Sequence, residues 1–263
     1  MHYLRMIAQF IRVSAKEETA YALNFWISLV HALLNLAGGV IGLLVLFNQV
    51  TAIQGWNFAS TLALLGVYLT ASALRNLFIG PSLESLAGME GEVWVGTLDF
   101  SLLRPVNIQF LASLRKWRLF ALIDLALGLA VLFIALLRTG LQFTLPYLLN
   151  FAFTMLIGIA VLYAVLLFFT ALVFWSPGFL YTWVFDGLFQ MARYPLGLYP
   201  GWLKLVLTWI IPVGVITTVP VQALTGSLPP LTQLALLVQA VLLIGGASWL
   251  FHRALRRYNS ASS

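Results

Sequence analysis

Cysteine is absent from the 263-residue sequence, and charged residues make up only 8% of it. The first absence excludes disulfides, thiolate metal sites and cysteine nucleophiles. The second accompanies a hydrophobic content of 62%, which is far above that of soluble globular domains. The sequence is therefore predicted to be an all-α integral membrane protein that forms one domain over residues 1–263.

Other chemical signatures are missing too. The sequence has no Gly-x-x-x-x-Gly-Lys-Ser/Thr for phosphates, no Gly-x-Ser-x-Gly, no His-Glu-x-x-His and no metal-ligand spacing. His31 is separated from the other histidines, so an interhelical hydrogen bond is a better interpretation than a metal ligand. The net charge of +6 is scattered at helix ends, which argues against nucleic-acid binding. We expect neither an intrinsic enzyme nor a cofactor or metal bound by this chain.

Long apolar runs predict about six transmembrane helices, because roughly 20 helical residues cross about 30 Å of hydrocarbon. The fifth contains Pro212, Gly214 and Pro220, so a kinked helix is expected, either as fixed shape or as a gating bend. The predicted spans are 23–47, 57–79, 117–137, 145–174, 202–221 and 231–251.

Basic residues set the predicted orientation, since cytoplasmic loops retain Lys and Arg during insertion. Both termini are placed in the cytoplasm, and Arg138 alone falls at an outer end. The residues assigned to the inner side are Arg5, Arg12, Lys16, Arg104, Arg115, Lys116, Arg118, Arg193, Lys204, Arg253, Arg256 and Arg257.

Two further regions lie outside the predicted spans. Residues 1–20 alternate basic and apolar positions at helical spacing, which predicts a helix in the inner membrane interface. Residues 176–200 are aromatic and weakly charged. This segment is predicted to lie in the interface or to form a re-entrant segment.

The inner loop 82–116 carries the most patterned polar sequence, with Glu90-Gly91-Glu92 ahead of Gly96–Pro105. A short helix with Leu98, Leu102 and Leu103 on one side is expected there, ended by Pro105. Such a helix is suited to docking into a partner's groove. The alternative interpretation is a loop that lies along the membrane surface.

Two stretches resemble a known family. One is Gly-Thr-Leu-Asp-Phe-Ser-Leu-Leu-Arg-Pro-Val-Asn at 96–107, and the other is Tyr-Pro-Leu-Gly-Leu-Tyr-Pro-Gly-Trp at 194–202, continuing through Ile211-Pro212 to Pro220 and Gly226. They are similar to the membrane subunits of ABC-2 type ATP-binding-cassette transporters, in the branch once catalogued as a permease family of unknown function.

The resemblance implies a permease that exports a substrate across a bacterial plasma (inner) membrane. It implies P-loop ATPase subunits that hold ATP and Mg, a second permease subunit, identical or paralogous, and contact with membrane lipids. It also makes the inner loop a coupling helix between spans two and three. The residues that the resemblance assigns to ATPase coupling are Leu98, Asp99, Phe100, Leu102, Leu103, Arg104 and Pro105.

The first span carries a stripe of polar and small residues. Its members recur at spacings of four and three, and they are Asn24, Ser28, His31, Asn35, Gly38 and Gly42. Such a stripe faces lipid unfavourably, because unsatisfied amides cost free energy in hydrocarbon. We expect it to lie either at a helix or dimer interface, which the Gly-x-x-x-Gly spacing favours, or along the translocation path.

Arg75 and Asp124 are the charges placed within predicted spans. An ion pair between them is expected, with a proton or substrate relay as the alternative. If that relay included His31, the chain could be an ion-coupled secondary transporter. A non-transporting scaffold that recruits a partner through the inner loop is a third hypothesis. The nearly uncharged spans weakly favour an amphipathic or neutral substrate.

Overall fold

The computed structural model describes residues 2–140, 144–226 and 228–258, and the chain is 79% helical with almost no sheet. The helices are α1 (His2–Thr19), α2 (Ala22–Gln49), α3 (Phe58–Leu74), α4 (Gly80–Glu84), α5 (Glu92–Val95), α6 (Leu98–Leu102), α7 (Ile108–Leu114), α8 (Ala121–Thr139), α9 (Leu145–Leu172), α10 (Tyr181–Gln190), α11 (Gly201–Leu205), α12 (Val213–Leu224) and α13 (Pro230–Leu255). Four short helical segments differ from the α-helix in pitch. Two are π-helical, η1 (Arg75–Ile79) and η4 (Val206–Ile210), and two are 3-10 helices, η2 (Met191–Arg193) and η3 (Leu196–Leu198).

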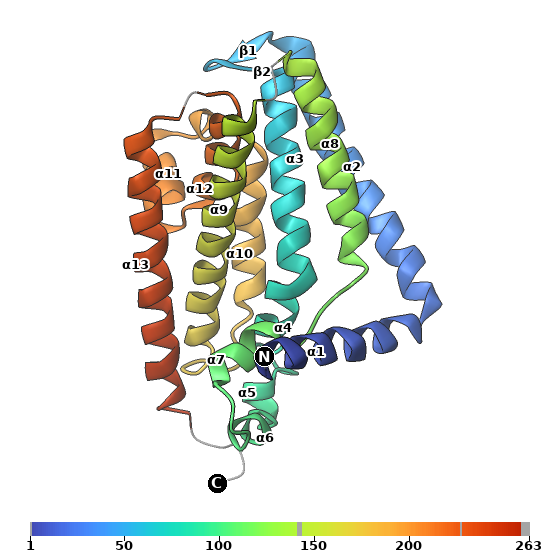
Figure 1. Cartoon of the computed structure of the whole chain (residues 1–263), viewed down its shortest axis with the longest axis vertical. Helices are drawn as coiled ribbons and strands as arrows, with labels where there is room; N and C mark the ends of the chain where they lie inside the picture. Colours follow the sequence, from blue (N-terminus) through green and yellow to red (C-terminus); the bar gives the residue numbers. More distant parts are fainter. Residues whose placement is uncertain (1, 141–143, 227, 259–263) are drawn as a thin grey trace.

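Five of the described helices are long and apolar enough to cross a membrane, and a bent pair makes a sixth candidate. This confirms the predicted all-α membrane class. The long helices run side by side, and α1 lies across one end of the bundle, where the last turn of α13 also ends (Figure 1). The opposite end carries the two-residue strands β1 (Ala52–Ile53) and β2 (Trp56–Asn57). We call these the α1 end and the hairpin end.

The centre of the bundle consists of α3, α9 and α12. The helix α3 packs against α8 and α12, while α9 packs against α12 and α13. Glycine permits the closest of these approaches: a Cβ on Gly66 would lie 2.6 Å from the backbone nitrogen of Leu132, and one on Gly128 would lie 2.8 Å from that of Thr70. Any larger side chain at either position would push α3 and α8 apart.

By contrast, α2 lies at the edge of the bundle beside α3 and α8 (Figure 1). Only 17% of its most apolar window is buried, against 78% for the span that begins at Phe58. Most of α2 is therefore free to meet lipid or another chain.

The segment 176–200 enters the bundle. Tyr181, Phe185 and Phe189 on one face of α10 are at most 2% exposed, and Phe189 contacts the ring of Tyr68 in α3 at 5.1 Å between centroids. The aromatic face of α10 is therefore enclosed by protein. In Figure 1 the helix α10 begins near the α1 end and stops part-way along the bundle.

The predicted fifth span is broken more sharply than a kink. The two pieces Gly201–Ile210 and Val213–Leu224 meet at 89°. Pro212 lies at this break and provides no N–H for a continuous helix. Pro220, in contrast, is accommodated inside α12.

The span boundaries differ from the predicted ones on the α1 side. The second span continues through the π-helical turn η1 and α4 to Glu84, and the third begins at Ala121. The start of α8 is fixed by α1, because the Glu18 carboxylate accepts the backbone N–H groups of Leu119 (2.8 Å) and Phe120 (3.2 Å). Burial raises the pKa of Glu18, and these hydrogen bonds oppose that shift. The helix α1 is thus bound to the body of the protein.

Candidate functional site

The α1 end of the bundle carries the short helices α5 and α6, which project beyond α1 (Figure 1). We call the segment 89–103 the tip. Six of its apolar side chains are exposed: Met89 (72%), Trp94 (52%), Val95 (56%), Phe100 (70%), Leu102 (42%) and Leu103 (82%). An exposed group of this kind marks an interaction site more often than a solvated loop.

One part of the predicted docking face is wrong. Leu98 is only 2% exposed and belongs to the hydrophobic core, so it does not share a surface with Leu102 and Leu103. The helix also ends at Leu102, before Pro105. Phe100 takes the place of Leu98 as an exposed apolar residue of α6.

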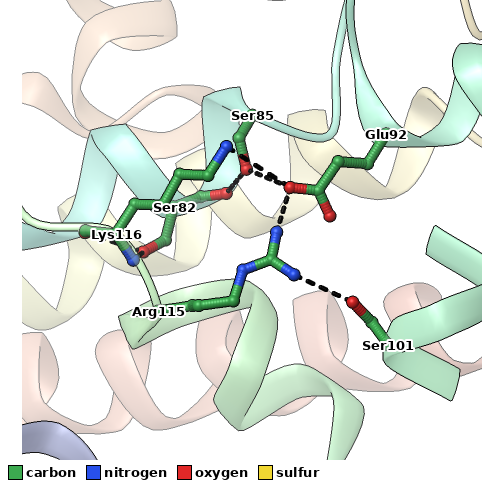
Figure 2. A network of polar contacts seen from close by, with 6 residues as sticks. All are labelled: Ser82, Ser85, Glu92, Ser101, Arg115 and Lys116. Atoms are coloured by element: carbon green, nitrogen blue, oxygen red, sulfur yellow. Dashed lines mark hydrogen bonds and ion pairs between the residues drawn. The ribbon is translucent and has the colours of Figure 1, made fainter. Parts of the chain in front are cut away.

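Figure 2 shows the polar network beneath the tip. The guanidinium of Arg115, at the end of α7, donates to the Glu92 carboxylate of α5 and to the Ser101 hydroxyl of α6, the latter at 2.8 Å. Lys116 adds a second cation 3.4 Å from the same carboxylate. Glu92 and Arg115 are 12% and 22% exposed, so this ion pair is partly desolvated. It joins α5, α6 and α7 into one unit.

The same network reaches α4, which continues the second span. The Ser82 hydroxyl donates to the Lys116 carbonyl at 2.9 Å and accepts its N–H at 2.8 Å. Ser85 lies 2.8 Å from the Ser82 carbonyl and 3.2 Å from the Glu92 carboxylate. The tip is therefore bound to the end of a buried transmembrane helix as well as to α7 (Figure 2).

The helix α7 connects the tip to two further spans. Gln109 donates to the Tyr163 hydroxyl of α9 at 3.0 Å and to the Ser248 hydroxyl of α13 at 2.9 Å. Ser113 lies 2.8 Å from the same Tyr163 hydroxyl. Displacement of the tip would therefore act directly on α9 and α13.

The coupling motif also contacts the chain beyond α13. Tyr258 lies beside Asp99 of α6, and its ring meets that of Phe174 at 6.0 Å. Burial raises the pKa of Tyr258, and the Asp99 carboxylate adds to the shift. Asp99 is thus directed towards the protein, whereas Arg104 and Pro105 lie exposed.

The predicted pair of Arg75 and Asp124 is wrong. Arg75, which is 7% exposed, binds Glu84 and Asp186, each at 2.6 Å. Its guanidinium also lies 4.9 Å from the centre of the Phe185 ring. This cluster joins η1, α4 and α10 near the α1 end. Sequence spacing missed it because Asp186 lies 111 positions from Arg75.

Asp124 instead meets the first span, where it interacts electrostatically with His31. The polar stripe on α2 is divided between two sides. Ser28, Asn35 and Gly42 are partly buried, whereas Asn24, His31 and Gly38 are exposed. A Cβ on Gly38 would meet nothing within 4 Å, so the Gly-x-x-x-Gly pair does not pack as a unit inside this chain.

Arg193 was assigned to the inner side, and the structure places it near the middle of the bundle. It donates to the Asn35 amide oxygen, and its guanidinium lies 4.9 Å from the centre of the Tyr68 ring. Asn35 is 13 residues after the first and 14 before the last residue of α2. At 1.5 Å per residue, each end of that helix is therefore about 20 Å away.

Arg193 has no carboxylate partner in the described part of the chain. Its Nε is buried without a hydrogen bond to any described residue. A guanidinium has five donors, so most of its capacity is unused. An ionisable side chain in this position is a functional candidate, and the signal that could have found it is the break of the helical pattern at Pro195.

The described residues contain no group of three or more His, Cys, Asp or Glu able to hold a metal ion. The candidate site consists of a surface and a set of charges within the bundle. Its two parts are the apolar tip on its polar network and the intramembrane Arg193 beside α2.

Comparison with known proteins gives one match. The family described as "ABC-2 family transporter protein" matches residues 33–262. No curated protein and no solved structure matches the chain. The matched range includes the tip, Arg193 and the first span from residue 33 onwards.

Proposed function

Since the chain belongs to the ABC-2 family of transporter proteins, we propose that it is the permease subunit of an ATP-driven exporter. In this proposal two permeases, identical or paralogous, form the translocation path in a bacterial plasma membrane. Two separate P-loop ATPases bind ATP and Mg, because the chain has no phosphate-binding loop. Permeases of this family are generally non-catalytic subunits.

The observation that carries the proposal is the exposed apolar tip on its polar network. The ATPase docks on Phe100, Leu102 and Leu103, and the α1 end faces the cytoplasm. A docked ATPase exerts force on a unit that Arg115 and Glu92 hold together. Because that unit is bonded to α4, α9 and α13, the force passes to three spans as a rigid-body displacement.

The translocation path is proposed to run along α2 at Asn35 and Arg193. A cation without a carboxylate partner in this position is suited to an acceptor or anionic group of the substrate. The exposed side of α2, with Asn24, His31 and Gly38, then faces the second permease. In this arrangement one side of α2 lines the translocation path, and the other side forms the dimer interface.

Substitution of Leu103 by Asp tests the docking role. Leu103 is 82% exposed, so the change costs little internal packing. Loss of one buried apolar anchor, about 1.5–3 kcal/mol, corresponds to about 10- to 100-fold weaker binding. The tagged chain is purified from its own membranes, and the P-loop ATPase recovered with it is quantified by mass spectrometry.

Leu103→Met is the matched control, since it keeps an apolar side chain of similar volume. We expect the ATPase to be recovered with the wild type and with Leu103→Met, and to be lost with Leu103→Asp. Equal recovery with all three chains would contradict docking at the tip. If the ATPase is recovered with the wild-type chain but its ATP hydrolysis is not stimulated by substrate, the scaffold hypothesis would be favoured.

An ion-coupled transporter is the competing function, and the proximity of Asp124 and His31 favours it. Purified chain in liposomes distinguishes the two. Transport driven by an ion gradient, without ATP and without the ATPase, would support this alternative.

A further inference from the structure

Two cavities adjoin each other on the α1-end half of α13. The first has a volume of about 390 Å³ and is lined by Ser248, Trp249, His252, Arg253 and Arg256. The second has a volume of about 470 Å³ and lies between α9, η4 and α13. Trp249 lines both. The two cavities therefore follow the same helix, one after the other.

The first cavity is cationic. Its lining includes two arginines and a histidine and no carboxylate, and neither arginine takes part in an ion pair among the described residues. The Arg253 guanidinium lies 5.2 Å from the centre of the Trp249 ring, which fixes its position over that side chain. His252 Nδ1 donates to the Ser248 carbonyl at 2.8 Å. The two guanidinium groups suit a phosphate.

The second cavity is apolar. Its lining residues include Phe168 and Phe169 of α9, Ile210 of η4, and Leu242, Gly246 and Leu250 of α13. At 1.5 Å per residue, α13 rises about 20 Å from Leu242 to Arg256. One leaflet contributes about 15 Å of hydrocarbon. The distance therefore fits a molecule with a charged group at the membrane surface and a chain within one leaflet.

We propose that these cavities form a binding site for an anionic phospholipid. Its phosphate lies at Arg253 and Arg256, and one acyl chain occupies the space beside Gly246. A free phosphate would contact only the cationic cavity, and a hydrocarbon would contact only the apolar one. A phospholipid would contact both. The cationic cavity is lined by residues of α13 and its C-cap, and clusters of Lys and Arg at the end of a transmembrane helix bind such headgroups in other membrane proteins. The site goes beyond the proposed transport function and does not depend on it.

The lipid also reaches the connection between the tip and α13. Ser248, which lines the cationic cavity, accepts the hydrogen bond from Gln109 of α7. A bound headgroup therefore lies against the same turn of α13 that carries force from the tip.

Native mass spectrometry tests the site. The full chain is purified in detergent with equal amounts of phosphatidylglycerol and phosphatidylcholine that carry the same acyl chains, and the retained lipids are counted. We expect preferential retention of phosphatidylglycerol. The double substitution Arg253→Gln and Arg256→Gln should weaken it about thirtyfold, at roughly one factor of five for each charge near the surface. Arg257→Gln is the control, because Arg257 is exposed and does not line the cavity.

A pair of glycines tests the acyl chain. A Cβ on Gly245 or on Gly246 meets nothing within 4 Å, so both accept a larger side chain without a clash. Only Gly246 lines the apolar cavity. Gly246→Leu should therefore reduce retention of phosphatidylglycerol at least several-fold, and Gly245→Leu should not.

Several results would overturn the proposal. Equal retention of both lipids would exclude the cationic site, and equal effects of the two glycine substitutions would exclude the acyl-chain site. Full competition by inorganic phosphate, or equal retention of a six-carbon phosphatidylglycerol, would indicate a headgroup site alone. A dimer that retains no lipid and dissociates on Gly246→Leu would show that a second copy covers this face.

Discussion

Two arginines within the bundle differ in the charge of their partners. Arg75, near the α1 end, is held by the carboxylates of Glu84 and Asp186. Arg193, half-way along the bundle, has a neutral amide and an aromatic ring as partners. The first charge is neutralised by its own chain, and the second is not. For this reason Arg75 is expected to stabilise the fold, and Arg193 is the arginine to which the proposed function assigns a ligand.

The α1 end and the middle of the bundle differ in the same way. The described ion pairs lie at the α1 end, in the cluster around Arg75 and the network around Glu92. In the middle of the bundle the chain breaks at Pro212, with α10 ending part-way and α12 continuing at an angle. The α1 end is cross-linked by charge, and the middle has interrupted helices.

The largest effect on stability is expected from Arg75→Leu. Removal of the guanidinium leaves two carboxylates close together. Breaking a fully buried ion pair in this way costs about 3–5 kcal/mol, and the 43% exposure of the Asp186 side chain lowers that cost here. The midpoint of thermal unfolding in detergent should fall sharply or folded protein should be lost. Arg138→Leu is the control, because Arg138 is exposed and takes part in no ion pair among the described residues, with its guanidinium 5.9 Å from the centre of the Phe58 ring.

Combining Arg75→Leu with Glu84→Gln and Asp186→Asn should restore much of the lost stability, because no uncompensated charge remains. If Arg75→Leu and Arg138→Leu had equal effects, the cluster around Arg75 would not stabilise the fold.

An intermediate effect is expected from Arg115→Gln. The substitution removes the ion pair with Glu92 and the hydrogen bond to Ser101, and we expect a loss of about 1–3 kcal/mol. Amide hydrogen exchange in α5 and α6 should rise, and ATP hydrolysis by the docked ATPase should respond less to substrate. Arg104→Gln, an exposed change in the same loop, should leave the amide exchange of α5 and α6 unchanged. Unchanged exchange in Arg115→Gln would show that the network does not hold the tip.

The smallest effect on stability is expected from Arg193→Leu. Desolvation of an unneutralised guanidinium offsets its one hydrogen bond and its ring contact, so the free energy of unfolding should change by less than about 1 kcal/mol. Substrate-stimulated ATP hydrolysis should nevertheless fall at least about tenfold, with partial recovery in Arg193→Lys. A stability loss like that of Arg75→Leu, with normal stimulation, would make Arg193 a structural residue.

The long spans were predictable because each needs only a local apolar run. The tip motif was located too, since its polar residues interrupt an otherwise apolar sequence. The face of α6 was predicted incorrectly, because Leu98 and Leu103 look alike in sequence while only tertiary packing buries the first.

The intramembrane charges show where sequence reasoning fails. Arg75 and Asp124 were paired on the assumption that adjacent spans bring them together, but α10 enters the bundle and supplies Asp186 instead. Arg193 was interpreted as a topology signal because it lies outside the long apolar runs, where Lys and Arg mark the inner side. A short helix that enters the bundle and stops has too few residues to give an apolar run of its own.

The most direct test of the account uses the absence of cysteine, because one introduced thiol is unique in the chain. Leu103→Cys at the tip and Leu4→Cys on α1 are both highly exposed, with native side chains 82% and 72% accessible. A thiol-to-amine cross-linker is applied to the assembled complex. The account predicts a covalent product with the P-loop ATPase from position 103 and none from position 4. No product from position 103, or equal products from both, would contradict docking at the tip.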